Sequence, residues 1–244
     1  MTTGHVPARV VCAFNPVADG IHDPDLVREK ILLLGEHINE CSNWNHEKKI
    51  SLMVSDGTLR LCGYEIIDAL QNECEIDVCA DYKFNATFGE MQPYLIALAD
   101  GYAPKALTVS HLCGTDTITR VRALFPHTKI YVSATLAGCA MDVSIIADLV
   151  RYCHLDGIVC STYDARTYRE RLPLPLDLFV TEGYATRELL VEGGDPEYFG
   201  GASFSLLKEV SGIPVMLLPD PEVFGSFFRE IFGKESRMSQ YLSI

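Results

Sequence analysis

The sequence predicts an α/β protein with the fold of a (β/α)8 barrel, also called a TIM barrel, and two observations support this. Short apolar runs rich in Val, Ile and Leu recur without strict alternation, which is typical of parallel strands buried on both faces. Helical periodicity follows most of these runs, and alternating strands and helices imply parallel strands joined by right-handed crossovers. Eight such runs within 244 residues fit a closed barrel better than an open doubly wound sheet.

The expected elements follow in chain order. The strands are expected at residues 10–14, 50–54, 76–80, 106–109, 130–134, 157–160, 176–180 and 213–218. The helices are expected at residues 24–41, 63–71, 90–99, 116–124, 142–152, 165–172, 203–210 and 221–232. Asp23 is a suitable N-cap for the first helix, and Gly233 is a suitable stop for the last.

The apolar residues of the first helix are expected on one stripe, which is made of Leu26, Val27, Ile31, Leu34 and Ile38. After the first strand the chain reads Phe14-Asn15-Pro16, without the glycine fingerprint of a dinucleotide-binding or P-loop protein. No low-complexity linker divides the chain. We therefore predict a single barrel domain over residues 1–233, followed by a C-terminal tail at residues 234–244.

Charge and composition exclude several classes of protein. Twenty basic and 33 acidic side chains give a net charge of 20 − 33 = −13, which argues against binding of a nucleic acid polymer. A hydrophobic content of 48% excludes an acidic disordered protein. The negative charge also gives no general attraction to an anionic substrate, so local groups would have to hold a phosphate.

The chain carries no signal of export or of membrane insertion. No basic region followed by an apolar stretch begins it, and no apolar run approaches the roughly 18 residues of a membrane span. Nine scattered cysteines, an odd number without a CxxC motif, fit free thiols in a reducing compartment better than disulfides or a zinc site. We expect a cytoplasmic protein that needs no metal or other cofactor.

In a barrel of this kind the active site lies at the C-terminal ends of the strands. The polar residues at or just after the expected strand ends are Asn15, Ser55, Asp56, Asp81, Lys83, Ser110, His111, Thr135, Ser161, Thr181, Glu182 and Asp220. Asp81 and Lys83 stand out because residues two apart in an extended chain point to the same side. The carboxylate can keep the ammonium protonated and aimed at a developing carbanion. A salt bridge at the barrel mouth without a catalytic role is the alternative.

The segment Ala80-Asp81-Tyr82-Lys83-Phe84-Asn85 resembles the D-x-K-x-x-D strand end of the orotidine 5′-monophosphate decarboxylase superfamily. Three further stretches are similar to that family: TVSH at residues 108–111, DGIVCS at 156–161 and VTEG at 180–183. The resemblance implies a barrel that forms a homodimer and acts on a small-molecule substrate of the nucleotide or nucleoside kind. It also implies that Lys83 gives a proton to the carbanion left by decarboxylation, with Asp81 as its partner.

The resemblance is incomplete at positions that matter for the family's chemistry. The family's network has a Lys at the end of the second strand, an Asp after the first and a final Asp in D-x-K-x-x-D; these positions are Met53, Asn15 and Ala86 here. Asp56 is a candidate replacement carboxylate. The family's phosphate-binding Arg after the eighth strand is absent, since the chain reads Leu218-Pro219-Asp220 there, and Arg187 is the nearby cation.

Two hypotheses follow. In the first, the protein is a diverged lyase without a metal, acting through Lys83 and Asp81 on a pyrimidine-nucleotide-like substrate that stabilises a carbanion. In the second, it is a non-catalytic barrel homologue that serves as a ligand-binding or protein-interaction module. The candidate catalytic residues are Lys83 and Asp81, and the candidate substrate-binding residues are Asn15, Asp56, Ser110, His111, Ser161, Glu182 and Arg187.

Overall fold

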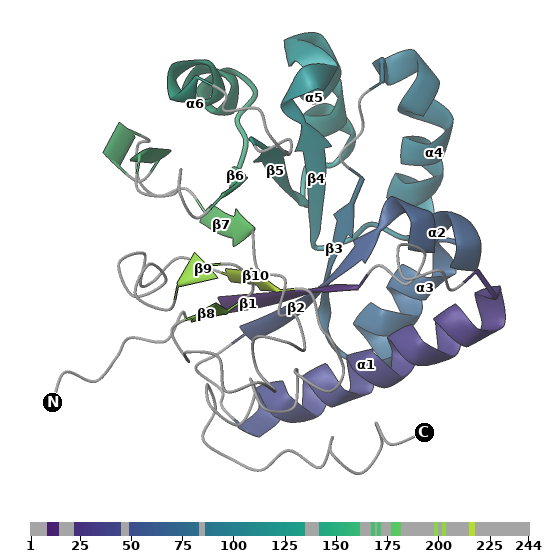
Figure 1. The fold of residues 1–244 in the computed structure, drawn as a ribbon. Coiled ribbons are helices and arrows are strands. Elements are labelled where there is room, and N and C mark those ends of the chain that lie inside the picture. Colours follow the sequence, from purple (N-terminus) through teal and green to yellow (C-terminus); the bar gives the residue numbers. More distant parts are fainter. Residues whose placement is uncertain are drawn as a thin grey trace, which may run out of the picture.

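The computed structural model has the barrel that the sequence predicts (Figure 1). It describes residues 9–14, 22–44, 49–82, 86–134, 142–161, 167–168, 170–171, 177–181, 198–199, 202–203 and 215–217. The barrel strands are β1 (Arg9–Phe14), β2 (Lys49–Ser55), β3 (Asp77–Asp81), β4 (Ala106–Ser110), β5 (Lys129–Ser133), β6 (Gly157–Ser161), β7 (Asp177–Thr181) and β10 (Val215–Leu217). All neighbouring pairs are parallel, in the order β1-β10-β7-β6-β5-β4-β3-β2, and β1 pairs with β2 to close the barrel.

The register of the strands separates two cores. One set of alternate residues faces the surrounding helices and belongs to the large hydrophobic core: Leu52, Val54, Val78, Ala80, Leu107, Val109, Ile130, Val132, Ile158 and Cys160 contribute to it from the strands. The other set fills the barrel interior, where Met53, Cys79, Ala106, Tyr131 and Val159 form a second buried cluster. Strands buried on both faces explain why the sequence shows continuous apolar runs rather than alternation.

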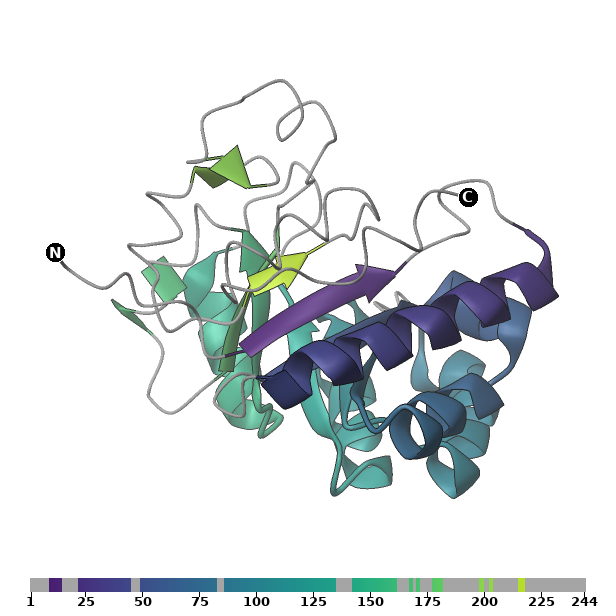
Figure 2. The same ribbon diagram turned by 90° about the horizontal axis from the view of Figure 1, so that it is seen from below.

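The helices lie outside the strands (Figures 1 and 2). They are α1 (Pro24–Trp44), α2 (Asp56–Cys62), α3 (Glu65–Asp68), the π-helix η1 (Ala69–Glu73), α4 (Phe88–Gly101), the 3-10 helix η2 (His111–Cys113), α5 (Gly114–Leu124) and α6 (Val143–Tyr152). A two-residue antiparallel pair, β8 (Tyr198–Phe199) with β9 (Ala202–Ser203), lies apart from the barrel sheet. As expected, Asp23 caps α1, since its carboxylate accepts hydrogen bonds from the backbone N–H of Asp25 and of Leu26.

The segment after β2 is more helical than expected. The helix expected at residues 63–71 corresponds to α3 and η1, but α2, which begins directly at Asp56, was not predicted. The reason is a local cap: the Ser55 hydroxyl accepts a hydrogen bond from the Thr58 N–H, which starts a helix at once. Gly63, with φ of 80°, then ends α2.

The expected elements in the C-terminal part of the chain differ from the structure, agree with it in part or lie outside the described residues. Ser203, expected to begin a helix, belongs to β9. Residues 167–168 and 170–171 are helical within the expected helix 165–172. The expected helix at 221–232, Gly233 and the tail at 234–244 lie outside the described residues, and the extent of the domain stays a prediction.

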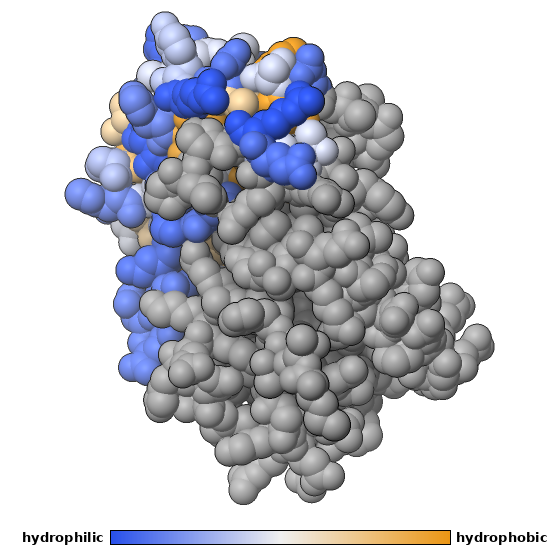
Figure 3. Space-filling view, turned by 90° about the vertical axis from the view of Figure 1, so that its left-hand side faces the viewer, coloured by the Kyte–Doolittle hydropathy of each residue, from blue (hydrophilic) through white to orange (hydrophobic). Residues whose placement is uncertain are grey.

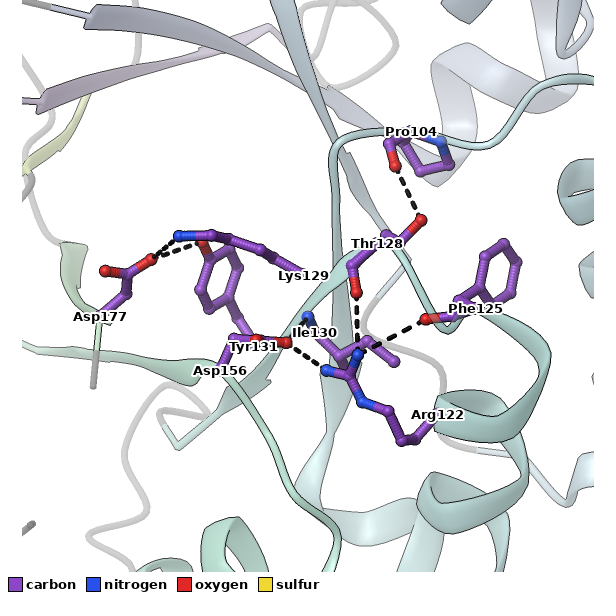
Figure 4. Close-up of polar contacts among 9 residues, drawn as sticks. All are labelled: Pro104, Arg122, Phe125, Thr128, Lys129, Ile130, Tyr131, Asp156 and Asp177. Atoms are coloured by element: carbon purple, nitrogen blue, oxygen red, sulfur yellow. Dashed lines mark hydrogen bonds and ion pairs between the residues drawn. The ribbon is translucent and has the colours of Figure 1, made fainter. Parts of the chain in front are cut away.

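A polar network ties together the N-terminal ends of β5, β6 and β7 (Figure 4). Arg122 forms an ion pair with Asp156 and donates a hydrogen bond to the Thr128 carbonyl at 3.0 Å. Asp177 accepts hydrogen bonds from Lys129 at 2.6 Å and from the Tyr131 hydroxyl at 2.9 Å. Because this end of a TIM barrel is opposite the active-site end, we interpret the network as a contribution to stability.

The described surface is polar in part, and most of the described thiols are buried. On the face in Figure 3, the described residues in the upper part are mostly hydrophilic, with hydrophobic atoms between them. Among the described residues, no helix has the length and apolar character needed to cross a bilayer. Cysteines 62, 74, 79, 113, 153 and 160 form no disulfide, and burial raises the pKa of Cys62, Cys74 and Cys153.

Candidate functional site

The C-terminal edge of the barrel brings together several of the strand-end residues singled out in the sequence. Ser55 at the end of β2 lies opposite Asp81 at the end of β3, and Asp81 lies opposite Thr108 of β4. One step further along, Ser110 at the end of β4 lies opposite Ser133 at the end of β5. The ends of β2 to β5 therefore form a continuous polar arc at the edge where barrel enzymes bind their substrates.

Beyond β5 the same edge continues with the ends of β6 and β7. Ser161 lies opposite Thr181, the last residues of these two strands. This register places Ser161 at the predicted edge of the barrel.

Asp81 is held by a hydrogen bond that the sequence analysis did not anticipate. The hydroxyl of Thr108, which is 0% exposed, donates to Asp81 Oδ1 at 2.5 Å. A hydroxyl donor this close to a carboxylate makes a charge-assisted hydrogen bond, which is stronger than one between neutral groups. The bond fixes the position of the half-buried carboxylate. Only the strand register, which pairs Asp81 with Thr108, reveals this contact.

At the end of β3, the side chains of Asp81 and Tyr82 lie in different surroundings. The Tyr82 side chain is buried and belongs to the core between the barrel and the helices. Burial, with a smaller contribution from the Tyr64 hydroxyl, raises the pKa of Tyr82 far above its ordinary value. Asp81 bonds instead to Thr108 on the neighbouring strand. Lys83, the candidate proton donor, lies outside the described residues.

His111 and Ser110 connect the ends of β4 and β5. The Ser110 hydroxyl accepts a hydrogen bond from the Leu112 N–H at 3.2 Å and so caps η2. The His111 ring is buried, and its Nδ1 lies 2.8 Å from the backbone oxygen of Ser133. Since Ser133 ends β5, the imidazole spans the edge between two adjacent strands. Sequence reasoning found His111 as a strand-end residue but could not identify a backbone partner 22 positions away.

Asp56 lies near this edge but is engaged elsewhere. It is the first residue of α2, and its carboxylate accepts from Arg60 Nε at 2.8 Å. The Arg60 guanidinium also lies over the ring of Tyr94, 5.5 Å from its centroid. The hydrogen bond to Asp56 raises the pKa of Arg60. This pairing within α2 does not support Asp56 as a replacement for the carboxylate missing at Ala86.

Two of the positions at which the chain departs from the resemblance, Met53 and Ala86, have apolar surroundings. Met53 is 2% exposed and packs in the barrel interior with Cys79 and Tyr131, so no charged group replaces a lysine there. Ala86 packs against the large hydrophobic core. Both departures remove a charge without placing another at the same position.

The remaining candidates cannot be placed. Asn15, Glu182 and Arg187 lie outside the described residues, as does Asp220, and the side chain of Ser161 is not described. Within the described part of the chain, no three His, Cys, Asp or Glu side chains are arranged to hold a metal ion.

Comparison with solved structures gives the same fold at low sequence identity. Orotidine 5′-monophosphate decarboxylase of Methanocaldococcus jannaschii, solved with the inhibitor BMP, has 16% identity and a TM-score of 0.62, covering 96% of this chain and 99% of that one. Orotidine 5′-phosphate decarboxylase of Pyrococcus horikoshii OT3 has 15% identity and a TM-score of 0.57, covering 92% and 100%. An uncharacterized conserved protein of Geobacillus kaustophilus has 11% identity and a TM-score of 0.59, covering 95% and 98%.

No protein-family model and no curated protein matches the chain. The likeness to orotidine 5′-phosphate decarboxylase therefore stands on the fold: the chain is an α/β barrel of that type, over nearly its whole length.

Proposed function

We propose that the protein is a lyase that cleaves a carbon–carbon bond in a pyrimidine-nucleotide-like substrate, with Lys83 as proton donor and Asp81 as its partner. The observation that carries this proposal is the position of Asp81. It ends β3 at the C-terminal edge of the barrel and is fixed there by the buried Thr108 hydroxyl. A carboxylate held by a neutral donor keeps its negative charge available for a nearby cation.

The reaction we propose is a decarboxylation. The bond between the substrate carbon and its carboxylate breaks, CO2 leaves, and the electron pair stays on the carbon. The Lys83 ammonium transfers its proton to that carbon, and Asp81 favours the protonated form of Lys83 before the transfer. Residues two apart in an extended chain share a side, so an extended continuation of β3 would place Lys83 on the side of Asp81.

The departures at Met53 and Ala86 favour a substrate other than that of the decarboxylases that share the fold. With neither a second lysine nor a second aspartate, the site has less charge with which to destabilise a substrate carboxylate. The acidic chain, with a net charge of −13, also gives no general attraction to a phosphate. We therefore include substrates without phosphate in the proposal.

The test compares orotidine 5′-monophosphate with the nucleoside orotidine as substrates of the full-length protein. Loss of pyrimidine absorbance and release of CO2 are measured for the wild type and for Lys83→Met and Asp81→Asn. We expect turnover of at least one compound by the wild type and its loss in Lys83→Met. Turnover that survives Lys83→Met would overturn the mechanism, and no turnover of either compound would overturn this substrate class.

The second candidate is a non-catalytic ligand-binding or interaction module. The apolar surroundings of Met53 and Ala86 favour it, because the charges needed for decarboxylation are missing at these positions. Thermal unfolding with nucleotides, nucleosides and sugar phosphates separates the two candidates. A ligand present at 100 times its Kd stabilises by about 2.7 kcal/mol whether or not it reacts. Stabilisation without turnover supports the binding module.

We also propose a cytoplasmic homodimer whose partner subunit lies against the loop after β3. The basis is the resemblance of residues 80–85, because in the decarboxylase superfamily this loop reaches the neighbouring subunit. Light scattering during size-exclusion chromatography tests the assembly, and a mass near the 27.1 kDa of one chain would contradict it.

A further inference from the structure

We propose that His111 presents an unprotonated Nε2 at the C-terminal edge of the barrel, where it accepts a hydrogen bond from an O–H or N–H group of the substrate. This inference rests on the proposed function for the identity of the site. It adds a neutral acceptor to the charged pair of Asp81 and Lys83.

The first step is the state of the ring nitrogens. His111 Nδ1 lies 2.8 Å from the Ser133 carbonyl oxygen. A carbonyl oxygen only accepts, so Nδ1 must carry the hydrogen of this bond. In a neutral imidazole the other nitrogen, Nε2, then has a free lone pair and acts as an acceptor. The backbone of β5 thereby selects one tautomer.

The second step is the surroundings of Nε2. His111 is 9% exposed, yet its Nε2 makes no hydrogen bond to any other described residue. His111 is nevertheless not fully enclosed, so a ligand at this edge of the barrel can reach it. Buried polar atoms are almost always paired, and one that is unpaired but reachable is suited to a ligand.

The third step is position. His111 directly follows Ser110, the last residue of β4, and its ring bonds to the last residue of β5. β4 is the neighbour of β3, which ends at Asp81, and Thr108 of β4 bonds to Asp81. The imidazole therefore belongs to the same polar arc as the candidate catalytic carboxylate, two strand ends away at most.

The fourth step is the chemical class of the ligand. An uncharged acceptor favours ligands that bear a hydroxyl or N–H group at this position. A ligand without such a donor leaves the buried acceptor unpaired, which costs free energy. It gives no preference for phosphate or carboxylate oxygens, which also only accept. The group that His111 recognises is thus a sugar hydroxyl or a ring N–H of the substrate.

Two substitutions separate this role from a structural one. In His111→Asn the amide nitrogen takes the place of Nδ1 and retains a donor to Ser133, but nothing replaces Nε2. In His111→Gln the longer side chain places an amide near the position of Nε2. A histidine needed only for packing and for the bond to Ser133 is better replaced by Asn, whereas an Nε2 acceptor is better replaced by Gln.

The first measurement needs no substrate. Long-range 15N–1H NMR spectra of the full-length protein labelled at histidine identify the His111 signals by their absence in His111→Asn. We expect the Nδ1–H tautomer and carbethoxylation of His111 by diethylpyrocarbonate, found by peptide mass spectrometry. The Nε2–H tautomer, or a His111 that resists the reagent while the exposed histidines react, would overturn the proposal.

The second measurement uses orotidine as the probe, added to the labelled wild type and to both variants. We expect the Nε2 signal to move on binding, His111→Asn to weaken binding about tenfold or more, and His111→Gln to stay within about threefold. Equal binding by His111→Asn and the wild type would overturn the contact. If the wild type neither binds nor turns over orotidine, the proposed substrate class fails, while the tautomer and the reagent still decide the state of Nε2.

Discussion

Removing the Thr108 hydroxyl tests whether Asp81 is positioned by β4. Thr108→Val keeps the shape of the side chain and deletes the donor to Asp81 Oδ1, which lies at 2.5 Å in the native protein. The site of the change is 0% exposed, so water cannot replace the hydroxyl from the side of Thr108. The carboxylate itself is half-buried and can recover part of its solvation.

The expected loss of stability follows from the full burial of Thr108 and the partial burial of Asp81. A hydrogen bond to a charged group contributes about 1.5–3 kcal/mol, and partial solvation of Asp81 places the expected loss at the lower end, about 1.5 kcal/mol. For a protein of this size the midpoint of thermal unfolding should fall by about 3–6 °C. Thr108→Ser is the matched control because it keeps the hydroxyl and loses a buried methyl, at a cost of about 1 kcal/mol.

Urea unfolding of a double-mutant cycle isolates the pair. Thr108→Val and Thr108→Ser are each made in the wild type and in Asp81→Ala. In Asp81→Ala the cost of Thr108→Val should fall by about 1.5 kcal/mol, whereas the cost of Thr108→Ser should stay the same. If Thr108→Val costs the same in both backgrounds to within about 0.5 kcal/mol, the two residues are not coupled and the positioning of Asp81 by Thr108 is refuted.

Two further predictions concern stability away from the site. Gly157→Ala should lower the free energy of unfolding by about 3 kcal/mol, because the added Cβ would overlap the fixed backbone oxygen of Asp177. Gly89→Ala, in open space at the start of α4, should raise it by about 0.5 kcal/mol. Urea unfolding that reverses this order would contradict the register of β6 with β7. Glu90 accepts hydrogen bonds from Thr87 that lower its pKa below the ordinary 4.5, so its contribution is present above that pH and is lost as the pH falls through the folded value. Between neutral pH and pH about 3, Glu90→Gln should therefore lose less stability than the wild type, and equal losses in thermal unfolding would contradict this.

The fold was predictable because strands buried on both faces leave a signal in every repeat. The second expected strand, residues 50–54, lies within β2, and the fifth, residues 130–134, differs from β5 by one residue at each end. α2 was missed for a local reason. Ser55 reads as a polar strand end, and nothing in the composition of the seven residues after it distinguishes a loop from a helix capped by that serine.

The candidate site was predictable in its members but not in its contacts. Asp81 and His111 stand out because they follow apolar runs, which requires only that the strands end where the runs end. The partners of these residues come from other strands. Thr108 lies 27 positions from Asp81 and Ser133 lies 22 positions from His111, and the register that pairs them is set by packing of the whole sheet.

The hydrogen bonds from Thr108 to Asp81 and from His111 to Ser133 together indicate what kind of site this barrel holds. A decarboxylase network with alternating lysines and aspartates needs charged groups on both sides of the reacting carbon, and β2 offers the uncharged Met53 and, opposite Asp81, the uncharged Ser55. On the β4 side, Asp81 meets a neutral hydroxyl, and beside it lies the His111 ring, which we propose as a neutral acceptor. Neutral donors and acceptors discriminate by the presence of a hydroxyl or N–H partner, whereas charged groups discriminate by charge. The described half of the mouth is therefore better suited to recognising the uncharged, hydrogen-bonding part of a substrate than to destabilising its carboxylate.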